Sequence, residues 1–298
     1  MLDKKKIKLG IAPIAWTNDD MPDLGAENSF QQCLSEIALS GFKGTELGNK
    51  FPTKTNELRR YLRVRKLSIA NAWFSSFILT KPYQEVEAEF RKKCKFLKSL
   101  GAKRIGVSEQ SYSIQGTDKA VFEEKYVMNA DEWATLTKCL NWLGEVAQDE
   151  FDIILTYHHH MGTVIQTEDE INQLMSSTDQ TKVFLLFDSG HLAYCNEDYL
   201  KVLQTYIDRI KHIHLKDVRV EKLNEIKENH LSFLAGVRKG AFTVPGDGSI
   251  DFAPIFEIIS KSNYEGWMIV EAEQDPDIAN PFEFALTARK YIKDIAKI

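Results

Sequence analysis

The chain has 298 residues, of which 43% are hydrophobic and 27% are charged, and its formal net charge is −5 at pH 7. This composition is typical of a soluble globular protein with a large core, and one large domain or two small ones fit the length. No linker divides the chain, so we expect one domain over residues 1–298. The negative charge argues against nucleic-acid binding, because phosphate contacts need clustered cations. The stretch after KKKIK is interrupted by Pro13 and soon becomes acidic, so it predicts neither a signal peptide nor a membrane span. We therefore expect a soluble, cytoplasmic protein that binds no membrane.

Short β-rich runs alternate with helical patterns along the whole chain. This alternation is typical of βα units, which build a parallel sheet. The predicted strands cover residues 7–13, 43–47, 67–73, 102–107, 152–158, 183–188, 210–215 and 267–273. The predicted helices cover residues 28–42, 55–66, 83–101, 127–149, 167–178, 196–208, 251–263 and 280–297.

Eight βα repeats within roughly 300 residues predict an α/β fold of the (β/α)8 TIM barrel type rather than a doubly wound sheet. No GxGxxG motif opens the first predicted helix, so dinucleotide binding has no support. A long insertion, residues 218–250, follows the seventh predicted strand. Loops at that end of a barrel strand lie on the active-site face, so we expect the insertion to form a lid or a substrate loop.

Polar side chains cluster at the ends of the predicted strands, and in a TIM barrel these ends converge on one pocket. The candidates are Glu46 in GTEL, His158 and His160 in TYHHH, Asp188 and His191 in FDSGH, His212, His214 and Lys216 in KHIHLK, and Glu271 and Glu273 in VEAE. Strand side chains alternate between two faces, so His158 and His160 point to one side and His159 to the other.

Carboxylates mixed with neutral imidazoles are the ligands that Mn²⁺, Co²⁺ or Zn²⁺ prefers. Asp188, His214 and Glu271 each come at the end of a short apolar strand, so we predict that they bind a divalent metal ion. His158 is the expected fourth ligand, although a neighbour in the histidine run could turn inward instead. Any one of these side chains alone would more often be a hydrogen-bonded structural residue, and only their joint occurrence favours a metal site.

Four further residues are candidates for substrate contact or proton transfer. Glu46 and Lys216 could bind substrate hydroxyls or exchange protons, and the alternative is a salt bridge across the barrel mouth. His160 and His191 are expected beside the metal ligands or against the substrate.

Several segments resemble the inosose dehydratases, which belong to the xylose isomerase-like TIM barrels. They are the opening KLGIAPIAWTNDD with the residues that follow it to KFP, then TYHHHMGT, FDSGH, HIHLKDV and PGDGSIDF. The resemblance implies dehydration of scyllo-inosose (2-keto-myo-inositol) to a trihydroxycyclohexane-1,2-dione in myo-inositol catabolism. It also implies a requirement for Mn²⁺ or Co²⁺, and glutathione as a further cofactor.

The superfamily usually holds its metal with Glu, Asp, His and Glu from strands five to eight. By this resemblance Asp188, His214 and Glu271 match the last three ligands. His158 stands where the first Glu is expected, and this difference changes the charge of the site. The resemblance thus implies His158, Asp188, His214 and Glu271 as the metal ligands.

Dehydration of a hydroxy ketone needs a base beside the carbonyl and an acid for the leaving hydroxyl. We expect Lys216 or Glu46 to exchange the proton, and His191 or His160 to protonate the leaving group. The substrate partner would be a small polyol ketone, and a homo-oligomer is compatible with this fold.

Other functions compete with this prediction. A metal-dependent ketose epimerase or isomerase of the same superfamily is the main alternative, because it forms the same enolate. A phosphodiesterase of the endonuclease IV kind would need a basic DNA-binding face. A barrel that has lost its metal could act as a binding protein, against which the set of Asp188, His214 and Glu271 argues.

Overall fold

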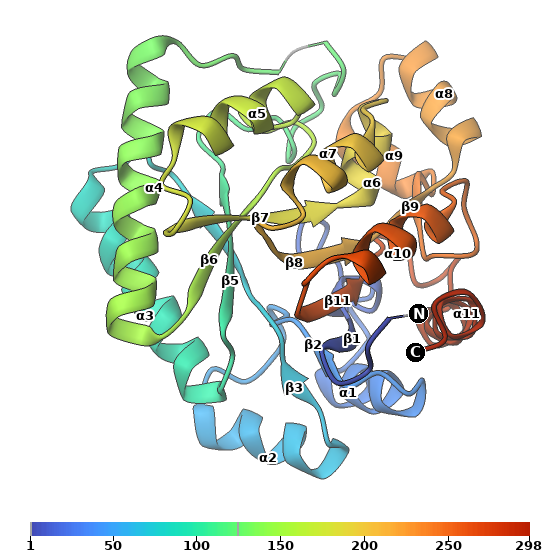
Figure 1. Cartoon of the computed structure of the whole chain (residues 1–298). Helices are drawn as coiled ribbons and strands as arrows, with labels where there is room; N and C mark the ends of the chain where they lie inside the picture. The colour runs from blue at the N-terminus through green and yellow to red at the C-terminus, as the bar shows by residue number, and fades with distance from the viewer. Residues whose placement is uncertain (1, 124) are drawn as a thin grey trace.

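Parallel strands curl into a barrel, with helices on its outside (Figure 1). The computed structural model describes residues 2–123 and 125–298. Within these residues the strands of the barrel sheet follow the order β3-β2-β1-β11-β8-β7-β6-β5-β4. The strands are β1 (Ile7–Ile11), β2 (Gly44–Thr45), β3 (Ser68–Ile69), β4 (Trp73–Ser76), β5 (Arg104–Glu109), β6 (Ile154–His158), β7 (Val183–Asp188), β8 (Ile210–Leu215) and β11 (Gly266–Val270).

The barrel closes through one stretch of chain that carries two short strands. β3 pairs with β2, where Ile69 lies opposite Thr45. β4 begins four residues after β3 ends and pairs with β5, where Trp73 lies opposite Gly106. Together β3 and β4 occupy the third of the eight strand positions of the barrel, and eight positions are what the sequence predicts.

Each predicted helix is present around this barrel. The helices that follow barrel strands are α1 (Phe30–Leu39), α2 (Thr55–Arg65), α3 (Tyr83–Leu100), α4 (Ala130–Phe151), α5 (Glu168–Ser177), α7 (Tyr199–Tyr206), α10 (Phe252–Lys261) and α11 (Pro281–Ala296). Two additional short helices, η1 (Pro13–Ala15) and α6 (Ser189–Tyr194), directly follow β1 and β7. No helix in the described part of the chain is both long enough and apolar enough to span a membrane.

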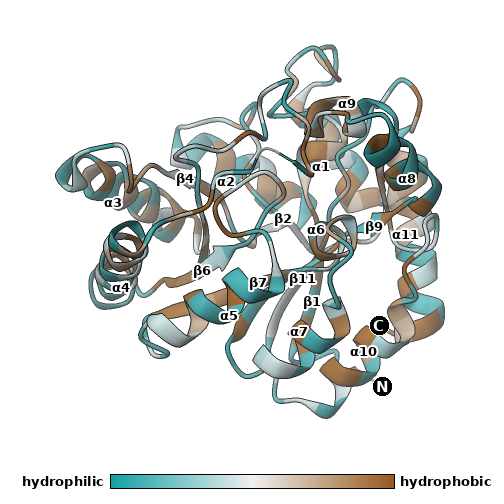
Figure 2. Ribbon diagram, turned by 90° about the horizontal axis from the view of Figure 1, so that it is seen from above, coloured by the Kyte–Doolittle hydropathy of each residue, from teal (hydrophilic) through white to brown (hydrophobic). Residues whose placement is uncertain are grey.

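Local sequence signals fix the starts of the helices. Asn129 caps α4 and exchanges hydrogen bonds with Glu132, and Thr167 does the same with Glu170 at the start of α5. Such capping boxes satisfy backbone N–H groups that have no partner in the first helical turn. Hydrophilic and hydrophobic residues are mixed along the helices, as Figure 2 shows, which is the pattern of helices that bury one side and expose the other.

The strand register places the predicted site residues at the same level along the barrel axis. Asp188 at the end of β7 lies directly opposite His214 on β8. His214 is in turn opposite Ile269 on β11, two residues before Glu271. Because side chains two residues apart share a face, this register places these functional groups on the same edge of the barrel.

The insertion after β8 is a folded unit rather than an irregular loop. It contains α8 (Val220–Glu228) and α9 (Phe233–Arg238), and its strand β10 (Phe242–Thr243) pairs antiparallel with β9 (Asp217–Val218). Arg238 forms an ion pair of 2.7 Å with Asp23, which ties α9 to the loop after β1. The role of the insertion as a lid or substrate loop stays a prediction, and its helices and strand form from residues that the sequence pattern predicts to be a loop.

Candidate metal centre and active site

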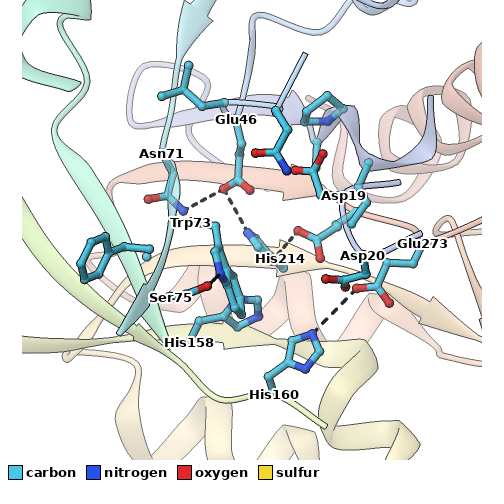
Figure 3. Close-up of a pocket in the computed structure, with 18 of the residues that line it drawn as sticks. Asp19, Asp20, Glu46, Asn71, Trp73, Ser75, His158, His160, His214 and Glu273 are labelled. Carbon is cyan, nitrogen blue, oxygen red and sulfur yellow. Dashed lines mark hydrogen bonds and ion pairs between the residues drawn. The ribbon is translucent and has the colours of Figure 1, made fainter. Parts of the chain in front are cut away.

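A cavity of about 410 Å³ opens at the carboxyl ends of the barrel strands (Figure 3). This volume falls within the range of small-molecule sites. Residues that follow β1, β2, β6 and β11 line it together with residues of β4 and β8. The polar lining residues are Asp19, Asp20, Glu46, Asn49, Asn71, Ser75, Lys93, Gln115, His158, His160, His214, Glu271 and Glu273.

The four predicted metal ligands meet beside this cavity, and all of them except Asp188 line it. Nε2 of His158 lies 3.4 Å from Oδ2 of Asp188. Nδ1 of His214 lies 3.3 Å from the same oxygen and 2.9 Å from Oε2 of Glu271. All four side chains are buried. Residues that are up to 113 positions apart in the sequence, His158 and Glu271, therefore form one compact cluster.

The ligand atoms of this cluster fit a divalent cation. Nε2 of His158, Oδ2 of Asp188 and Nδ1 of His214 are buried and have no hydrogen-bond partner among the described residues, although they lie within ion-pair distance of one another. The three atoms are close together, but the angles between them do not allow hydrogen bonds. Buried polar atoms without partners are unfavourable. Imidazole nitrogens and carboxylate oxygens that converge in this way match the chemistry of a transition-metal site.

The charges of the cluster also suit a cation. Burial lowers the pKa of His158 to about 4, so its imidazole is neutral at pH 7 and has a lone pair to offer. Burial alone would raise the pKa of Glu271, but His214 and Lys216 outweigh it and lower that pKa to about 2. Burial likewise opposes the charged form of His214, but Glu271, Glu46 and Asp188 hold its pKa well above the ordinary value. His214 must therefore release a proton before it can bind an ion.

Lys216 lies fully buried among carboxylates. Its Nζ is 2.7 Å from Oε1 of Glu271, 2.9 Å from Oε1 of Glu273 and 3.7 Å from Oδ2 of Asp188. Burial favours the neutral amine, but these three carboxylates raise the pKa of Lys216 above its ordinary value. The ammonium also lies 4.7 Å from the centre of the Phe242 ring, which comes from the insertion. Lys216 is therefore a fixed positive charge beside the predicted metal ligands.

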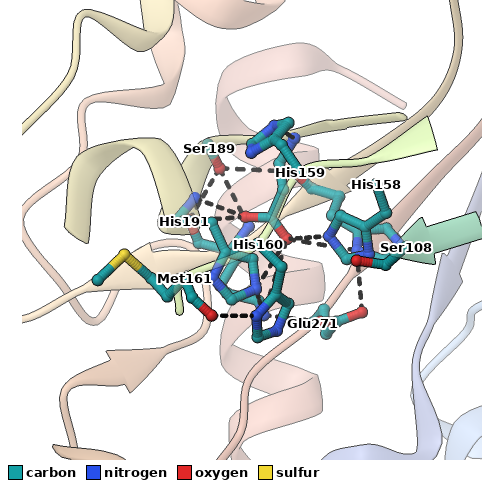
Figure 4. Close-up of polar contacts among 12 residues, drawn as sticks. Ser108, His158, His159, His160, Met161, Ser189, His191 and Glu271 are labelled. Atoms are coloured by element: carbon teal, nitrogen blue, oxygen red, sulfur yellow. Dashed lines mark hydrogen bonds and ion pairs between the residues drawn. The ribbon is translucent and has the colours of Figure 1, made fainter. Parts of the chain in front are cut away.

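His160 and His191 lie next to each other, with ring centres 3.7 Å apart. His160 lines the cavity, whereas His191 lies behind it and its Nε2 is 2.9 Å from Nζ of Lys216. Burial lowers the pKa of His191 well below its ordinary value, so this ring is neutral. Figure 4 shows the polar contacts of this region, where Nδ1 of His160 faces the backbone oxygen of Met161 at 2.9 Å.

Glu46 lines the cavity directly after β2 and contacts two histidines of β8. Its Oε1 is 2.8 Å from Nε2 of His212 and 3.1 Å from Nε2 of His214. The amide of Asn71 donates to the same oxygen at 3.0 Å. Burial would raise the pKa of Glu46, but His214 and His212 hold it well below its ordinary value. One carboxylate oxygen therefore binds three separate groups, as Figure 3 shows for two of them.

The three consecutive histidines have three different surroundings. His158 belongs to the predicted metal cluster and His160 lines the cavity. His159 points to the other face of the strand, as its parity predicts, and is nonetheless fully buried. Its Nε2 accepts a hydrogen bond of 3.2 Å from the backbone N–H of Asp188, so it supports the strand end that carries a predicted ligand.

Several cavity residues were missed by the sequence reasoning. Asp20 accepts a hydrogen bond of 2.7 Å from Gln115, and Asp19 and Lys93 lie in the same lining. A signal for the two aspartates exists, because the polar run TNDD follows the first strand in the way that FDSGH follows the sixth. Gln115 carries no comparable signal, because it belongs to a long connection between β5 and α4.

The fold and the polar cavity at its strand ends define a TIM-barrel enzyme. The xylose isomerase-like TIM barrel family matches residues 34–295. The crystal structure of the IOLI protein with a binding zinc atom superposes with a TM-score of 0.70 at 16% identity, covering 97% of this chain and 98% of that chain.

Sequence relatives define the enzyme family more narrowly. The inosose dehydratase of Clostridium perfringens is 60% identical over 97% of this chain and 97% of its own length. That of Clostridium beijerinckii is 58% identical over 99% of both chains. The chain belongs to the inosose dehydratases within the xylose isomerase-like TIM barrels. The predictions of a TIM barrel, of this family and of dehydratase activity are confirmed.

Proposed function

We propose that this enzyme removes water from scyllo-inosose to give a trihydroxycyclohexane-1,2-dione. In this reaction a C–H bond beside the ketone and a C–O bond on the neighbouring carbon break, a C=C bond forms, and water leaves. The observation that carries the proposal is the cluster of His158, Asp188, His214 and Glu271 at the side of a carboxylate-rich cavity. The names of the sequence relatives support the choice of an inosose as substrate.

The cavity favours an uncharged polyol over a phosphorylated sugar. Among the described lining residues, Lys93 is the only lysine or arginine, whereas five carboxylates line the same space. They are Asp19, Asp20, Glu46, Glu271 and Glu273. Carboxylates accept hydrogen bonds from hydroxyl groups and repel phosphate, so this lining suits a ring that carries several neutral hydroxyls.

We propose Mn²⁺ or Co²⁺ as the resident ion, held by His158, Asp188, His214 and Glu271. The zinc atom bound by the structurally similar IOLI protein supports the choice of a divalent ion. When bound, such an ion would supply Lewis-acid stabilisation of the negative charge on the ketone oxygen, worth several kcal/mol. Glutathione remains a prediction from the family resemblance, and the assay below includes it as a separate arm.

Only groups that line the cavity can exchange protons directly with a substrate. His160 and Glu273 line the cavity, whereas Lys216 and His191 do not. Lys216 is nevertheless within hydrogen-bond distance of Oε1 of Glu273 and Nε2 of His191. We propose that Glu273 accepts the proton of the C–H bond while His160 protonates the leaving hydroxyl, so that water leaves. Oε1 of Glu273 lies 3.9 Å from Nε2 of His160, so Glu273 can then return its proton to His160, while Lys216 stays protonated and holds Glu273 in place.

The test is an anaerobic assay of chelator-stripped enzyme with scyllo-inosose. The ultraviolet absorbance of the conjugated product is followed with and without Mn²⁺ or Co²⁺, and with and without glutathione. We expect metal-dependent product formation by the native chain and none by Asp188→Ala, which should also lose bound metal. An active, metal-loaded Asp188→Ala enzyme would contradict the site. A metal-loaded native enzyme that forms no dione but epimerises ketoses would favour the alternative function.

A further inference from the structure

We infer that Glu46 is a positioning residue, which orients the metal ligand His214 and selects the nitrogen that binds the ion, rather than a residue that exchanges protons with the substrate. This inference rests on the proposed metal site.

The hydrogen bonds of Glu46 determine where the hydrogen of His214 lies. A carboxylate oxygen can only accept, so Nε2 of His214, 3.1 Å from Oε1 of Glu46, carries the hydrogen. The other ring nitrogen, Nδ1, then faces Oδ2 of Asp188 at 3.3 Å and Oε2 of Glu271 at 2.9 Å. Glu46 therefore leaves Nδ1 as the nitrogen that can offer a lone pair to an ion.

Two additional donors hold Glu46 in place. Nε2 of His212 contacts Oε1 of Glu46 at 2.8 Å, and the amide of Asn71 donates to the same atom at 3.0 Å. His212 precedes His214 by two residues on β8, so both rings leave the strand on the same face. Glu46, His212, His214 and Asn71 are all buried. Three hydrogen bonds to Oε1 stabilise the ionised form of the Glu46 carboxylate, which makes it a weaker base, and they fix its orientation against the ring of His214.

Carboxylates that bind the distal nitrogen of a metal-bound histidine commonly fix its orientation, and their loss lowers metal affinity about 10- to 100-fold. The contact between Glu46 and His214 links the end of β2 to β8, and the two residues are 168 positions apart in the sequence. Through this contact Glu46 affects metal affinity, which a residue that only carries protons would not do.

The first experiment compares Co²⁺ binding and turnover in three proteins. They are the native enzyme, Glu46→Gln, and Asp19→Asn as a matched control that removes one carboxylate of the same cavity lining without touching His214. We expect Glu46→Gln to raise the Co²⁺ dissociation constant about 10- to 100-fold and to change the visible Co²⁺ spectrum. Asp19→Asn should raise the constant less than about threefold, because no ligand loses its orientation. Saturating Co²⁺ should restore much of the turnover of Glu46→Gln.

The outcomes separate this inference from the proposed function. Loss of Co²⁺ binding by the native enzyme would overturn the proposed site itself. Native-like Co²⁺ affinity in Glu46→Gln, together with lost turnover, would overturn only the positioning role and make Glu46 a proton carrier. If Glu46→Gln and Asp19→Asn lost Co²⁺ affinity equally, the loss would come from the removal of negative charge near the site and not from the orientation of His214. This result would also overturn the inference.

A second measurement needs no substitution, and it keeps the test sound if Glu46→Gln fails to fold. Long-range ¹H–¹⁵N spectra of histidine-labelled native enzyme loaded with Zn²⁺ report which nitrogen of His214 carries hydrogen. We expect hydrogen on Nε2 and metal on Nδ1. The reverse arrangement would overturn the inference.

Discussion

Nζ of Lys216 lies 2.7 Å from Oε1 of Glu271, so a buried ammonium directly contacts a predicted metal ligand. Glu273 and Asp188 also lie within ion-pair distance of this ammonium. In the absence of a divalent ion, Lys216 and protonated His214 together supply the positive charge of a cluster that buries several carboxylates.

Replacement of Lys216 by Met should destabilise the metal-free protein strongly. Removing one partner of a buried ion pair leaves uncompensated charge and typically lowers the free energy of unfolding by about 3–5 kcal/mol. Urea unfolding of chelator-treated protein measures this change. Lys261→Met, which removes an exposed lysine paired with Glu257, should change the midpoint little. An unchanged midpoint for Lys216→Met would contradict the view of Lys216 as the main counter-charge.

Metal affinity should rise with pH. Glu271, Glu46 and Asp188 hold the pKa of His214 above its ordinary value, so a proton competes with the ion for Nδ1 at neutral pH. Below that pKa each unit of pH should tighten Co²⁺ binding about tenfold, with about one proton released per ion. Titration calorimetry between pH 6 and 7, in two buffers of different ionisation enthalpy, measures both quantities. His158, with a pKa of about 4, should add no proton in this range, so a slope of two protons would contradict the assignment.

The stability of the insertion should depend on the protonation of Asp217. Its carboxylate accepts hydrogen bonds from the backbone of Gly248 and Ile250, which return the insertion to the barrel. Burial raises the pKa of Asp217 from 3.8 to about 6, so the folded state binds this proton more tightly than the unfolded state does. The contribution of this group to stability is full below pH 3.8 and is lost as the pH rises through 6.

The matched variant is Asp217→Asn, which has the same shape and does not titrate. We expect the free energy of unfolding of the native chain to fall by about 2 kcal/mol relative to Asp217→Asn between pH 4 and pH 7. Denaturant unfolding at each pH gives this difference. A difference that stays constant, or that increases with pH, would show that Asp217 has an ordinary or lowered pKa.

Phe242 should matter for both the insertion and the site. Its ring is fully buried and lies 5.3 Å from the ring of His191 and 5.9 Å from that of Phe233. Phe242→Ala should lower the free energy of unfolding by about 3–5 kcal/mol through lost burial and a cavity. Thermal and urea unfolding test this, with Val220→Ala as a control, because Val220 is 52% exposed. Equal effects of the two substitutions would mean that the insertion packs loosely.

Much of the fold could be predicted because its signals are local. Period-two apolar runs and capping residues act within one element, and the predicted strands and helices appear close to their expected positions. The sequence predicts one strand where the structure has both β3 and β4, because only three residues separate them. The sequence predicts the insertion as a loop, because Phe233 and Phe242 are buried by contacts with each other and with residues far away in the sequence, such as His191.

Short segments of the sequence are enough to predict the barrel and the ligand-type side chains at strand ends, because apolar period and the residue that ends a strand are local properties. The family is predicted by the resemblance of several motifs. Which of these side chains meet depends on the tertiary structure. Glu46 reaches His214 over 168 positions, and Lys216 contacts Glu273 over 57. These partners, and the protonation states that they impose, depend on distances across a closed barrel, which strand register and burial fix together and which no local pattern contains.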